Sequence, residues 1–408
     1  MLTALGPVFA LLASVALLLM GNGLQGTLLP VRAELEAFGA FNIGLLGSSY
    51  FAGFAVGCLF APRFVRRIGH IRSFTAFAAV ASAVVLAHAL AVTPGAWLPL
   101  RAITGFCFAG LYVVMESWLN ARATNQTRGA ILSLYTMVNL TVITLGQLMI
   151  VLADPQTFVL FSAAAILISL AGVPVALTTS PAPPPPSSVR ARPLKLYRLS
   201  PVGVVGAFAV GVANGPFWTL APAYGVASGL DTGGVALLMA LTVIGGAVGQ
   251  WPLGRLSDRV DRRWMILAGC LGAALAGAGL VATGILAPRW LLPTAFGFGA
   301  FAIPMYALCV AHANDFVDPA DFVETSSGLL LASALGSAIG PLLASAMMHQ
   351  VGPGGLFGTT AVIHLLLAGF VLYRMRRRAA PAARAPFVAV PRTSTGISTL
   401  DPRAEPVK

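Results

Sequence analysis

The sequence predicts an all-α membrane protein of twelve transmembrane helices arranged as two pseudo-symmetric six-helix bundles. Of its 408 residues, 57% are hydrophobic and only 9% are charged, whereas about a quarter of the residues in a soluble domain are charged. Apolar runs of about 20 residues, the length that spans a bilayer, recur along the chain. The second half also repeats landmarks of the first half at a separation of 192 residues.

The apolar runs and the proline-rich interruption between them predict the domain organisation. The first run lacks a basic flank and is too long for a signal-peptide core, so we expect it to remain as the first helix. The stretch PAPPPPSS, followed by several basic residues, is too proline-rich for a helix and too polar to span. We therefore expect a bundle over 1–178, a cytoplasmic linker over 179–200, a second bundle over 201–378 and a disordered tail over 379–408. The expected spans are 6–31, 41–62, 73–93, 97–120, 129–152, 156–178, 201–226, 233–254, 265–287, 290–313, 323–348 and 356–375.

Lys and Arg gather in alternate loops and after the last apolar run, while the opposite loops hold only Arg32 and Arg289. Basic loops stay in the cytoplasm, so both termini are expected there. The basic start of the tail suits contact with anionic membrane lipid, although a plain positive-inside anchor explains it equally well.

Several function classes are not supported. The basic residues lie in short loops rather than on a folded surface, which excludes nucleic-acid binding. The four cysteines lie inside apolar runs without metal-ligand spacing. The sequence has no phosphate-binding Gly-Lys loop and no catalytic triad. We therefore expect no enzyme activity, no cofactor and no metal.

The internal repeat aligns residues that composition alone would not match. Asn22-Gly23 aligns with Asn214-Gly215, Pro30 with Pro222, and Arg63 and Arg67 with Arg255 and Arg259. Gly53 and Gly57 align with Gly245 and Gly249, and we expect these four glycines to mark close contacts between helices. A parallel repeat of this kind is a known construction of transporters, with the substrate site between the halves.

Three local patterns resemble the major facilitator superfamily of membrane transporters. The pattern Gly254-x-x-x-Asp258-Arg259-x-x-Arg262-Arg263 matches a loop signature of that family, except that Asp261 replaces a usual glycine. Arg101-x-x-x-Gly105 is similar to the helix-4 pattern of proton-linked members. Glu116-Ser-Trp-Leu-Asn120 resembles a largely uncharacterised bacterial subgroup. The resemblance implies a monomeric carrier in the bacterial inner membrane, and the absence of the helix-5 Gly-Pro pattern weakens a drug-export interpretation.

The same family pattern implies a gate at the cytoplasmic ends of the helices. There, the acid of the loop signature approaches the start of helix 5 or helix 11 of the other half. This geometry would pair Asp258 with Arg128, and Arg66 with Asp321 and Glu324, and it would close the cavity on that side. The alternative is solvated loop charge that serves orientation only. The gate residues are Arg66, Arg67, Arg128, Asp258, Arg259, Arg262, Asp321 and Glu324.

Two ionisable residues, Arg101 and Glu116, lie clearly within a span, where charge is costly and commonly functional. Helical spacing places them on one stripe of helix 4, about 22 Å apart. We expect Glu116 to carry the coupling proton, with a structural acid as the equally weighted alternative. Arg101 stays charged and is expected to order the outer mouth or to hold an anionic group.

Neutral polar residues complete the expected cavity, although such residues also bond helices together. They are expected to contact a small organic solute that is neutral or weakly anionic. The leading interpretation is a proton-coupled secondary transporter. The alternatives are a drug or metabolite efflux antiporter and a non-transporting sensor or scaffold. The expected substrate contacts are Asn22, Gln25, Tyr112, Thr136, Asn139, Gln147, Asn214, Trp218 and Tyr306, with Tyr50 and His312 as further candidates.

Overall fold

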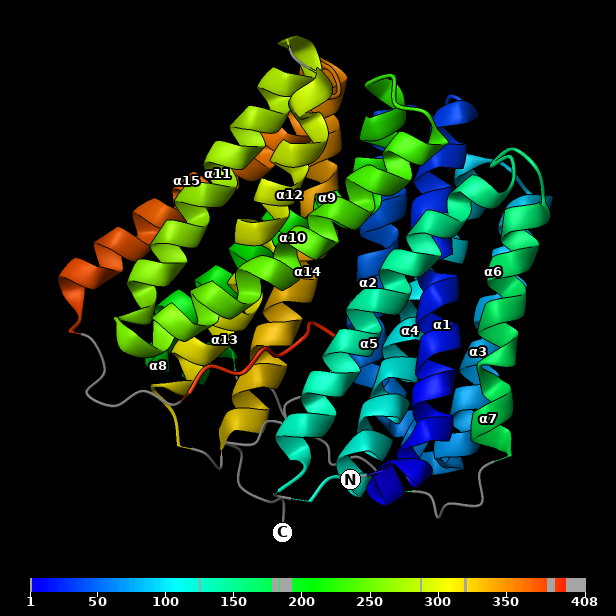
Figure 1. Cartoon of the computed structure of the whole chain (residues 1–408), viewed down its shortest axis with the longest axis horizontal. Coiled ribbons are helices and arrows are strands. Elements are labelled where there is room, and N and C mark those ends of the chain that lie inside the picture. Colours follow the sequence, from blue (N-terminus) through cyan, green and yellow to red (C-terminus); the bar gives the residue numbers. More distant parts are fainter. Residues whose placement is uncertain are drawn as a thin grey trace.

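The protein, studied as a computed structural model, folds into helices that run side by side in two bundles (Figure 1). Residues 2–124, 126–177, 183, 193–286, 288–318, 321–379 and 386–393 are described, with side chains omitted at 2–10, 193–194, 285, 286 and 288. Twelve of the described helical segments are long and apolar enough to cross a membrane, so the predicted number of spans is confirmed.

The first six spans form one bundle. Most of them are uninterrupted, but the fifth ends in a short 3₁₀ turn and the sixth consists of two consecutive helices. These elements are α1 (Leu2–Leu35), α2 (Ala40–Ile68), α3 (His70–Leu90), α4 (Pro94–Arg122), α5 (Arg128–Leu148), η1 (Met149–Leu152), α6 (Val159–Leu170) and α7 (Gly172–Ala176).

The last six spans form the second bundle, which follows a short helix, α8 (Pro193–Leu199), in the segment predicted to be a linker without helix. Pro193 is the first residue of this helix, a position where proline is tolerated because its missing N–H would be unpaired in any case. The other elements are α9 (Pro201–Ala227), α10 (Thr232–Arg259), α11 (Arg262–Leu286), η2 (Pro288–Trp290), α12 (Leu291–Ala302), α13 (Met305–Asn314), α14 (Phe322–Val351) and α15 (Gly355–Arg377).

Glycines at matching positions of the repeat allow matching helix pairs to pack closely. A Cβ atom on Gly53 of α2 would overlap the carbonyl of Ala102 on α4. Its counterpart Gly245 on α10 stands in the same relation to Phe296 on α12. Gly57 and Gly249 make equivalent approaches one turn further along. The expectation that these four glycines mark close helix contacts is confirmed.

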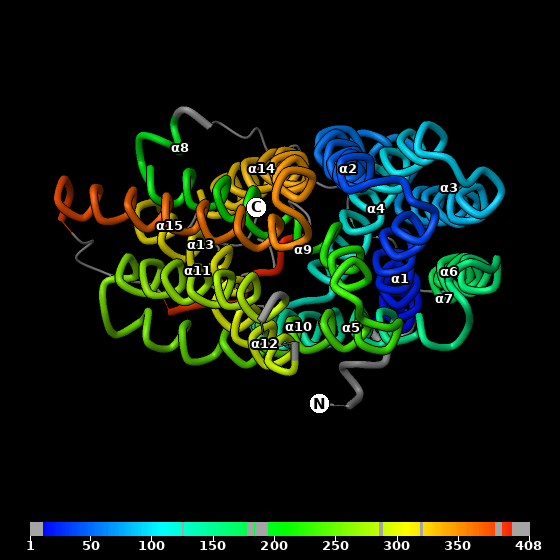
Figure 2. Tube along the Cα trace, turned by 90° about the horizontal axis from the view of Figure 1, so that it is seen from above, coloured from blue at the N-terminus to red at the C-terminus, as the bar shows by residue number. Residues whose placement is uncertain are grey.

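The two bundles touch along α2, α9 and α14 and along α5 and α10, which Figure 2 shows from above. We call the side with the ends of α2, α4, α10 and α15 the basic face, because Arg66, Arg67, Arg122, Arg259 and Arg377 lie there. The opposite side is called the far face. Gly44 at the start of α2 packs against Ser345 near the end of α14. This contact joins the two halves near the far face.

Candidate functional site

A cavity of about 260 Å³ lies between the two bundles and takes its wall from both. The wall combines aromatic and aliphatic side chains with a few neutral amides, which is the usual composition of a site for a small organic ligand. Its members include Asn22, Tyr50, Phe51, Phe54, Arg101, Tyr112, Thr136, Asn139, Gln147, Asn214, Trp218, Gln250, Tyr306, Ser337, Val390, Pro391, Arg392 and Thr393.

The structure brings every predicted substrate contact except Gln25 to this wall. Asn22, Gly23 and Gly26 of α1 line the cavity, and Gln25 projects to the side of that stripe at helical spacing. Its side chain is fully buried, and the described residues offer its amide no hydrogen bond. Of the two further candidates, Tyr50 lines the cavity, whereas His312 is buried beside Phe316.

Arg101 lies on the cavity wall near the far-face end of α4. Its guanidinium carbon is 4.4 Å from the centre of the Tyr50 ring, a distance at which a cation is attracted to the ring face. Its side chain is almost completely buried. Among the described residues no carboxylate forms an ion pair with it, so the cavity carries a positive charge toward the far face.

Glu116 lies behind the wall rather than on it, closer to the basic-face end of the same helix. It is fully buried, and its Oε1 atom accepts a hydrogen bond of 3.0 Å from the Tyr135 hydroxyl on α5. The same oxygen accepts a hydrogen bond from the Thr393 hydroxyl. Thr393 and Tyr112 line the cavity, and Thr393 thus joins the cavity to this buried carboxylate.

The tenth span is broken at Ile303 and Pro304, between α12 and α13. Proline has no N–H to continue the helical bonding, so a break there leaves carbonyls that need other donors. The Asn214 side chain on α9 donates to the carbonyl of Ala302 at 2.7 Å. Ile303 and Tyr306 then face the cavity from the two sides of the break. Asn214 therefore has a structural role in addition to its place on the wall.

The segment 386–393 reaches the cavity, where residues 390–393 form part of the wall, and sequence reasoning missed this placement. It was expected to belong to a disordered tail, but Val390 and Thr393 are buried and the segment forms part of the wall. In Figure 1 the segment is the red coil that enters between the bundles near α13 and α14. The apolar run Phe387–Val390 was the available signal, and it was obscured by the surrounding Pro, Ala, Ser and Thr.

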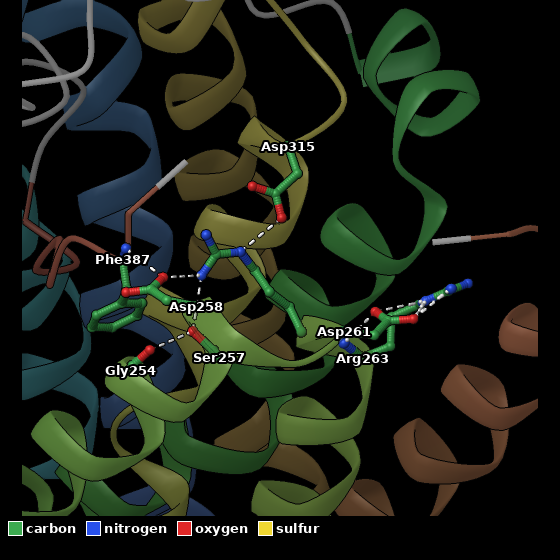
Figure 3. Close-up of polar contacts among 8 residues, drawn as sticks. Gly254, Ser257, Asp258, Asp261, Arg263, Asp315 and Phe387 are labelled. Atoms are coloured by element: carbon green, nitrogen blue, oxygen red, sulfur yellow. Dashed lines mark hydrogen bonds and ion pairs between the residues drawn. The ribbon is translucent and has the colours of Figure 1, made fainter. Parts of the chain in front are cut away.

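The loop signature forms a cluster of charges at the basic face (Figure 3). The Arg262 side chain is fully buried and bonds to Asp315 at 2.7 Å, to the Ser257 hydroxyl at 2.8 Å and to Asp258 at 3.2 Å. These contacts tie the end of α10, the start of α11 and the end of α13 together. Arg262, predicted as a gate residue, thus binds groups within the second bundle.

A second pair, Arg263 and Asp261, lies beside this cluster in Figure 3. Their ion pair measures 2.6 Å. Burial raises the pKa of Asp261, but hydrogen bonds and charge from Arg263 outweigh it, and the pKa is lowered overall. Arg263 also donates to the carbonyl of Arg378 at 2.6 Å. The position that is usually glycine in the family signature therefore anchors the start of the tail.

The other predicted gate residues lie around the same face. Asp258 pairs with Arg262 and also accepts a hydrogen bond of 2.7 Å from the backbone N–H of Phe387. Asp321 forms an ion pair of 3.2 Å with Lys195 of α8, a partner that was not predicted. Arg66, Arg67 and Arg259 are exposed, and Arg128 and Glu324 are partly buried.

Twelve spans in two repeated halves around a central cavity are the architecture of a membrane transport protein. The model of the Major Facilitator Superfamily matches residues 11–330 and 203–400. The chain belongs to this superfamily, which is a family of transporters and not of enzymes, and it is a multi-pass membrane protein.

Curated relatives match along most of the chain. An uncharacterized MFS-type transporter of Enterobacter sp. (strain 638) is 28% identical over 373 residues, covering 88% of this chain and 94% of the relative. One from Yersinia pestis (strain Pestoides F) is 27% identical over 390 residues, covering 94% and 98%. These relatives extend the family assignment over nearly the whole chain.

Solved structures share the fold at low sequence identity. The nucleoside transporter NupG superposes with a TM-score of 0.77 at 12% identity, covering 91% of this chain and all of that chain. A D-xylose-proton symporter superposes with a TM-score of 0.66 at 16% identity, covering 89% and 96%. The similarity supports the predicted fold of two six-helix bundles.

Proposed function

We propose that this protein is a proton-coupled secondary transporter that moves a small organic solute across the bacterial inner membrane by alternating access. The observation that carries the proposal is the buried carboxylate of Glu116, which lies next to the cavity on the same helix as Arg101. The mean spacing of an α-helix separates the two residues by about 22 Å. Arg101 lies toward the far face and Glu116 toward the basic face, which suits a pathway that opens first to one side of the membrane and then to the other.

Glu116 is suited to carry the proton because its partners are the hydroxyls of Tyr135 and Thr393, and a hydroxyl can donate to a carboxylate or accept from a protonated carboxyl group. A buried carboxylate without partners is costly, and here Tyr135 donates to it. A proton taken up from the cavity would remove the charge before the cavity closes. The alternative, a purely structural acid, predicts that Glu116 affects stability but not coupling.

Arg101 is suited to bind an electronegative part of the solute. Its contact with the Tyr50 ring holds the guanidinium at the wall of the cavity. Trp218 and Phe54 offer aromatic faces, and Asn22 and Asn139 offer amides. A neutral or weakly anionic solute with some aromatic character would fit this set.

Structural neighbours support transport of small polar solutes. They include a nucleoside transporter, a D-xylose-proton symporter and an E. coli fucose:proton symporter. Two of these neighbours are proton symporters, which favours symport with protons here. Efflux of a metabolite or drug in exchange for protons is the second candidate, since the same Glu116 would serve an antiporter.

The basic face is assigned to the cytoplasm in this proposal, because basic loops remain on that side during insertion. Both termini would then be cytoplasmic. The halves meet near the far face, so the cavity would face the cytoplasm in this conformation. Closing on the basic face would bring Asp258 toward Arg128 and Arg66 toward Glu324. A single chain has the complete cavity, which is consistent with a monomer.

Reconstituted liposomes with an imposed proton gradient test the proposal. Nucleosides, pentoses and aromatic carboxylates would be screened for solute-induced proton uptake with an internal pH dye. Wild type should show uptake with at least one class, and Glu116→Gln should lose accumulation while retaining solute exchange. Glu34→Gln, at the far-face end of α1, is the matched control. Accumulation by Glu116→Gln would exclude Glu116 as the carrier, and binding without flux would indicate a sensor.

A further inference from the structure

The carboxyl-terminal segment 386–393 makes contacts with both halves of the protein. Phe387 contacts α10 of the second bundle, and Arg392 contacts α14 of the second bundle and α2 of the first. Thr393 bonds to Glu116 of α4 in the first bundle. A segment that binds both halves at once resists their relative movement.

The segment extends from the basic face deep into the cavity. Phe387 lies beside Asp258 and Gly254, at the basic-face end of α10. Ser337, which Arg392 reaches, lies fifteen residues from the start of α14, and this corresponds to a depth of about 22 Å. The hydrocarbon core of a bilayer is about 30 Å thick. Arg392 therefore reaches the middle of the predicted membrane region.

The contacts at the inner end are those of a positively charged hydrogen-bond donor. The Arg392 guanidinium donates to the hydroxyls of Ser333 at 3.3 Å and Ser337 at 3.2 Å. The same guanidinium lies 5.8 Å from the centre of the Phe51 ring, within the range of a cation–π interaction. Val390 is buried just before it. An apolar residue and a held cation thus occupy the cavity together.

The contact at the outer end involves a residue of the predicted gate. The backbone N–H of Phe387 donates to the same Asp258 oxygen that accepts from Arg262. The proposed closure on the basic face requires Asp258 to approach Arg128. While the segment is docked, its backbone lies against Asp258, and closure requires the segment to leave.

The start of the tail is fixed on the basic face as well. Arg378 donates to the carbonyl of Leu199 at 2.6 Å and lies 4.2 Å from the centre of the Phe316 ring. Arg263 holds its carbonyl. Anchoring the chain so close to the entrance gives the segment an effective concentration on the order of millimolar at the cavity. Even a weak site would then be occupied.

We propose that residues 386–393 are a tethered ligand of the central cavity, and that docking excludes cargo and prevents closure on the basic face. This inference rests on the proposed function in treating the cavity as the cargo site. The ligand class that the site takes is an extended, apolar peptide segment bearing a guanidinium. The occupant is a part of this chain, and its release would be the regulated step.

A disulfide across the docked segment tests the placement directly. A Cβ atom on Gly254 would lie 3.0 Å from Cγ of Phe387, which places the two Cβ atoms within the range that a disulfide requires. The full-length double variant Gly254→Cys/Phe387→Cys should oxidise to a linked pair, identified by mass spectrometry. The four native cysteines are buried and can remain. Arg67→Cys/Phe387→Cys, with the partner cysteine on the exposed basic-face end of α2, is the control.

The expected result is linkage at least tenfold faster at Gly254 than at Arg67. Adding Arg392→Ala should slow the Gly254 linkage about twofold, because a tenfold loss of affinity, roughly 1.4 kcal/mol, lowers a docked fraction of about nine-tenths to about one-half. Arg376→Ala, an exposed arginine at the end of α15, should leave the rate unchanged. Equal rates at Gly254 and Arg67 would overturn the inference.

A synthetic peptide with the sequence of residues 386–393 tests whether the cavity binds this segment when it is not attached to the chain. The fluorescently labelled peptide should bind the full-length Val390→Asp/Arg392→Ala protein at least tenfold more tightly than wild type, whose own segment occupies the site. A scrambled peptide should not bind. Equal binding to both proteins, or none to either, would refute a tethered ligand. Both assays proceed without transport, so their failure is distinct from failure of proton coupling.

Discussion

Thr393 donates a hydrogen bond to Glu116, a residue that precedes it by 277 positions in the chain. The same carboxylate oxygen accepts from Tyr135. The proposed proton carrier is thus in contact with the docked tail on one side and with the bundle on the other. A transporter whose tail contacts its coupling carboxylate would move solute only in the fraction of molecules whose tail has left the cavity, so wild type would transport below its full rate.

Replacing Arg262 by Met is expected to destabilise the second bundle. The side chain of Asp315 is 1% exposed, and the substitution would remove the cation that pairs with its buried carboxylate. Removing one partner of a buried ion pair costs about 3–5 kcal/mol. Thermal unfolding of purified protein in detergent measures the change. Arg259→Met, at the exposed last residue of α10, should change stability by no more than about 0.5 kcal/mol.

The second substitution Asp315→Leu should recover part of the stability lost in Arg262→Met, because it removes the charge left behind. A double variant as unstable as the single one would show that the ion pair is not the reason for the loss.

Asn214→Leu is expected to destabilise the broken tenth span. The carbonyl of Ala302 would lose its donor, and leaving a buried acceptor unpaired costs about 1–3 kcal/mol. Asn22→Leu is the matched control at the equivalent position of the repeat, where the described residues offer the side chain no hydrogen bond. Thermal unfolding should separate the two variants, and equal losses would contradict a special role for Asn214.

Alanine at Gly53 is expected to disturb the first bundle, because its Cβ would overlap the carbonyl of Ala102 and push α2 away from α4. Overpacking of this kind costs about 1–3 kcal/mol. Gly369→Ala on α15, where a Cβ meets nothing within 4 Å, should be neutral or stabilise by up to about 1 kcal/mol. Unfolding temperatures compare the two substitutions, and a stable Gly53→Ala protein would refute the close contact.

Charge reversal tests the proposed gate. Arg66→Glu should impair solute flux in liposomes, since it would repel Glu324 when the basic face closes. The second reversal Glu324→Arg should restore part of the flux. Rescue should weaken at high salt, because exposed charges are screened. Arg63→Glu is the control on the same helix end. Without rescue in the double variant, the charges would serve orientation alone.

The sequence was sufficient for the number of spans, the two halves and the glycine contacts. These follow from local composition and from the repeat, because lipid imposes length and polarity on each segment independently. Helical spacing also placed Asn22, Thr136 and Asn214 on the cavity wall. It failed for Gln25, because this residue and Asn22, three positions apart, differ by about 60° around the helix, which is enough to separate the cavity from the bundle interior.

The tertiary structure decided which charges and which segments meet. Asp321 pairs with Lys195 and Asp258 with Arg262 and Phe387, partners that a pattern of residue types does not distinguish. The tail has no amphipathic period, and its place in the cavity depends on Ser333, Ser337, Phe51 and Glu116 converging from three helices. Sequence alone determined the membrane fold because that depends on each segment's own hydrophobicity. Only the folded chain, which brings distant groups within hydrogen-bonding distance, decided what fills the centre.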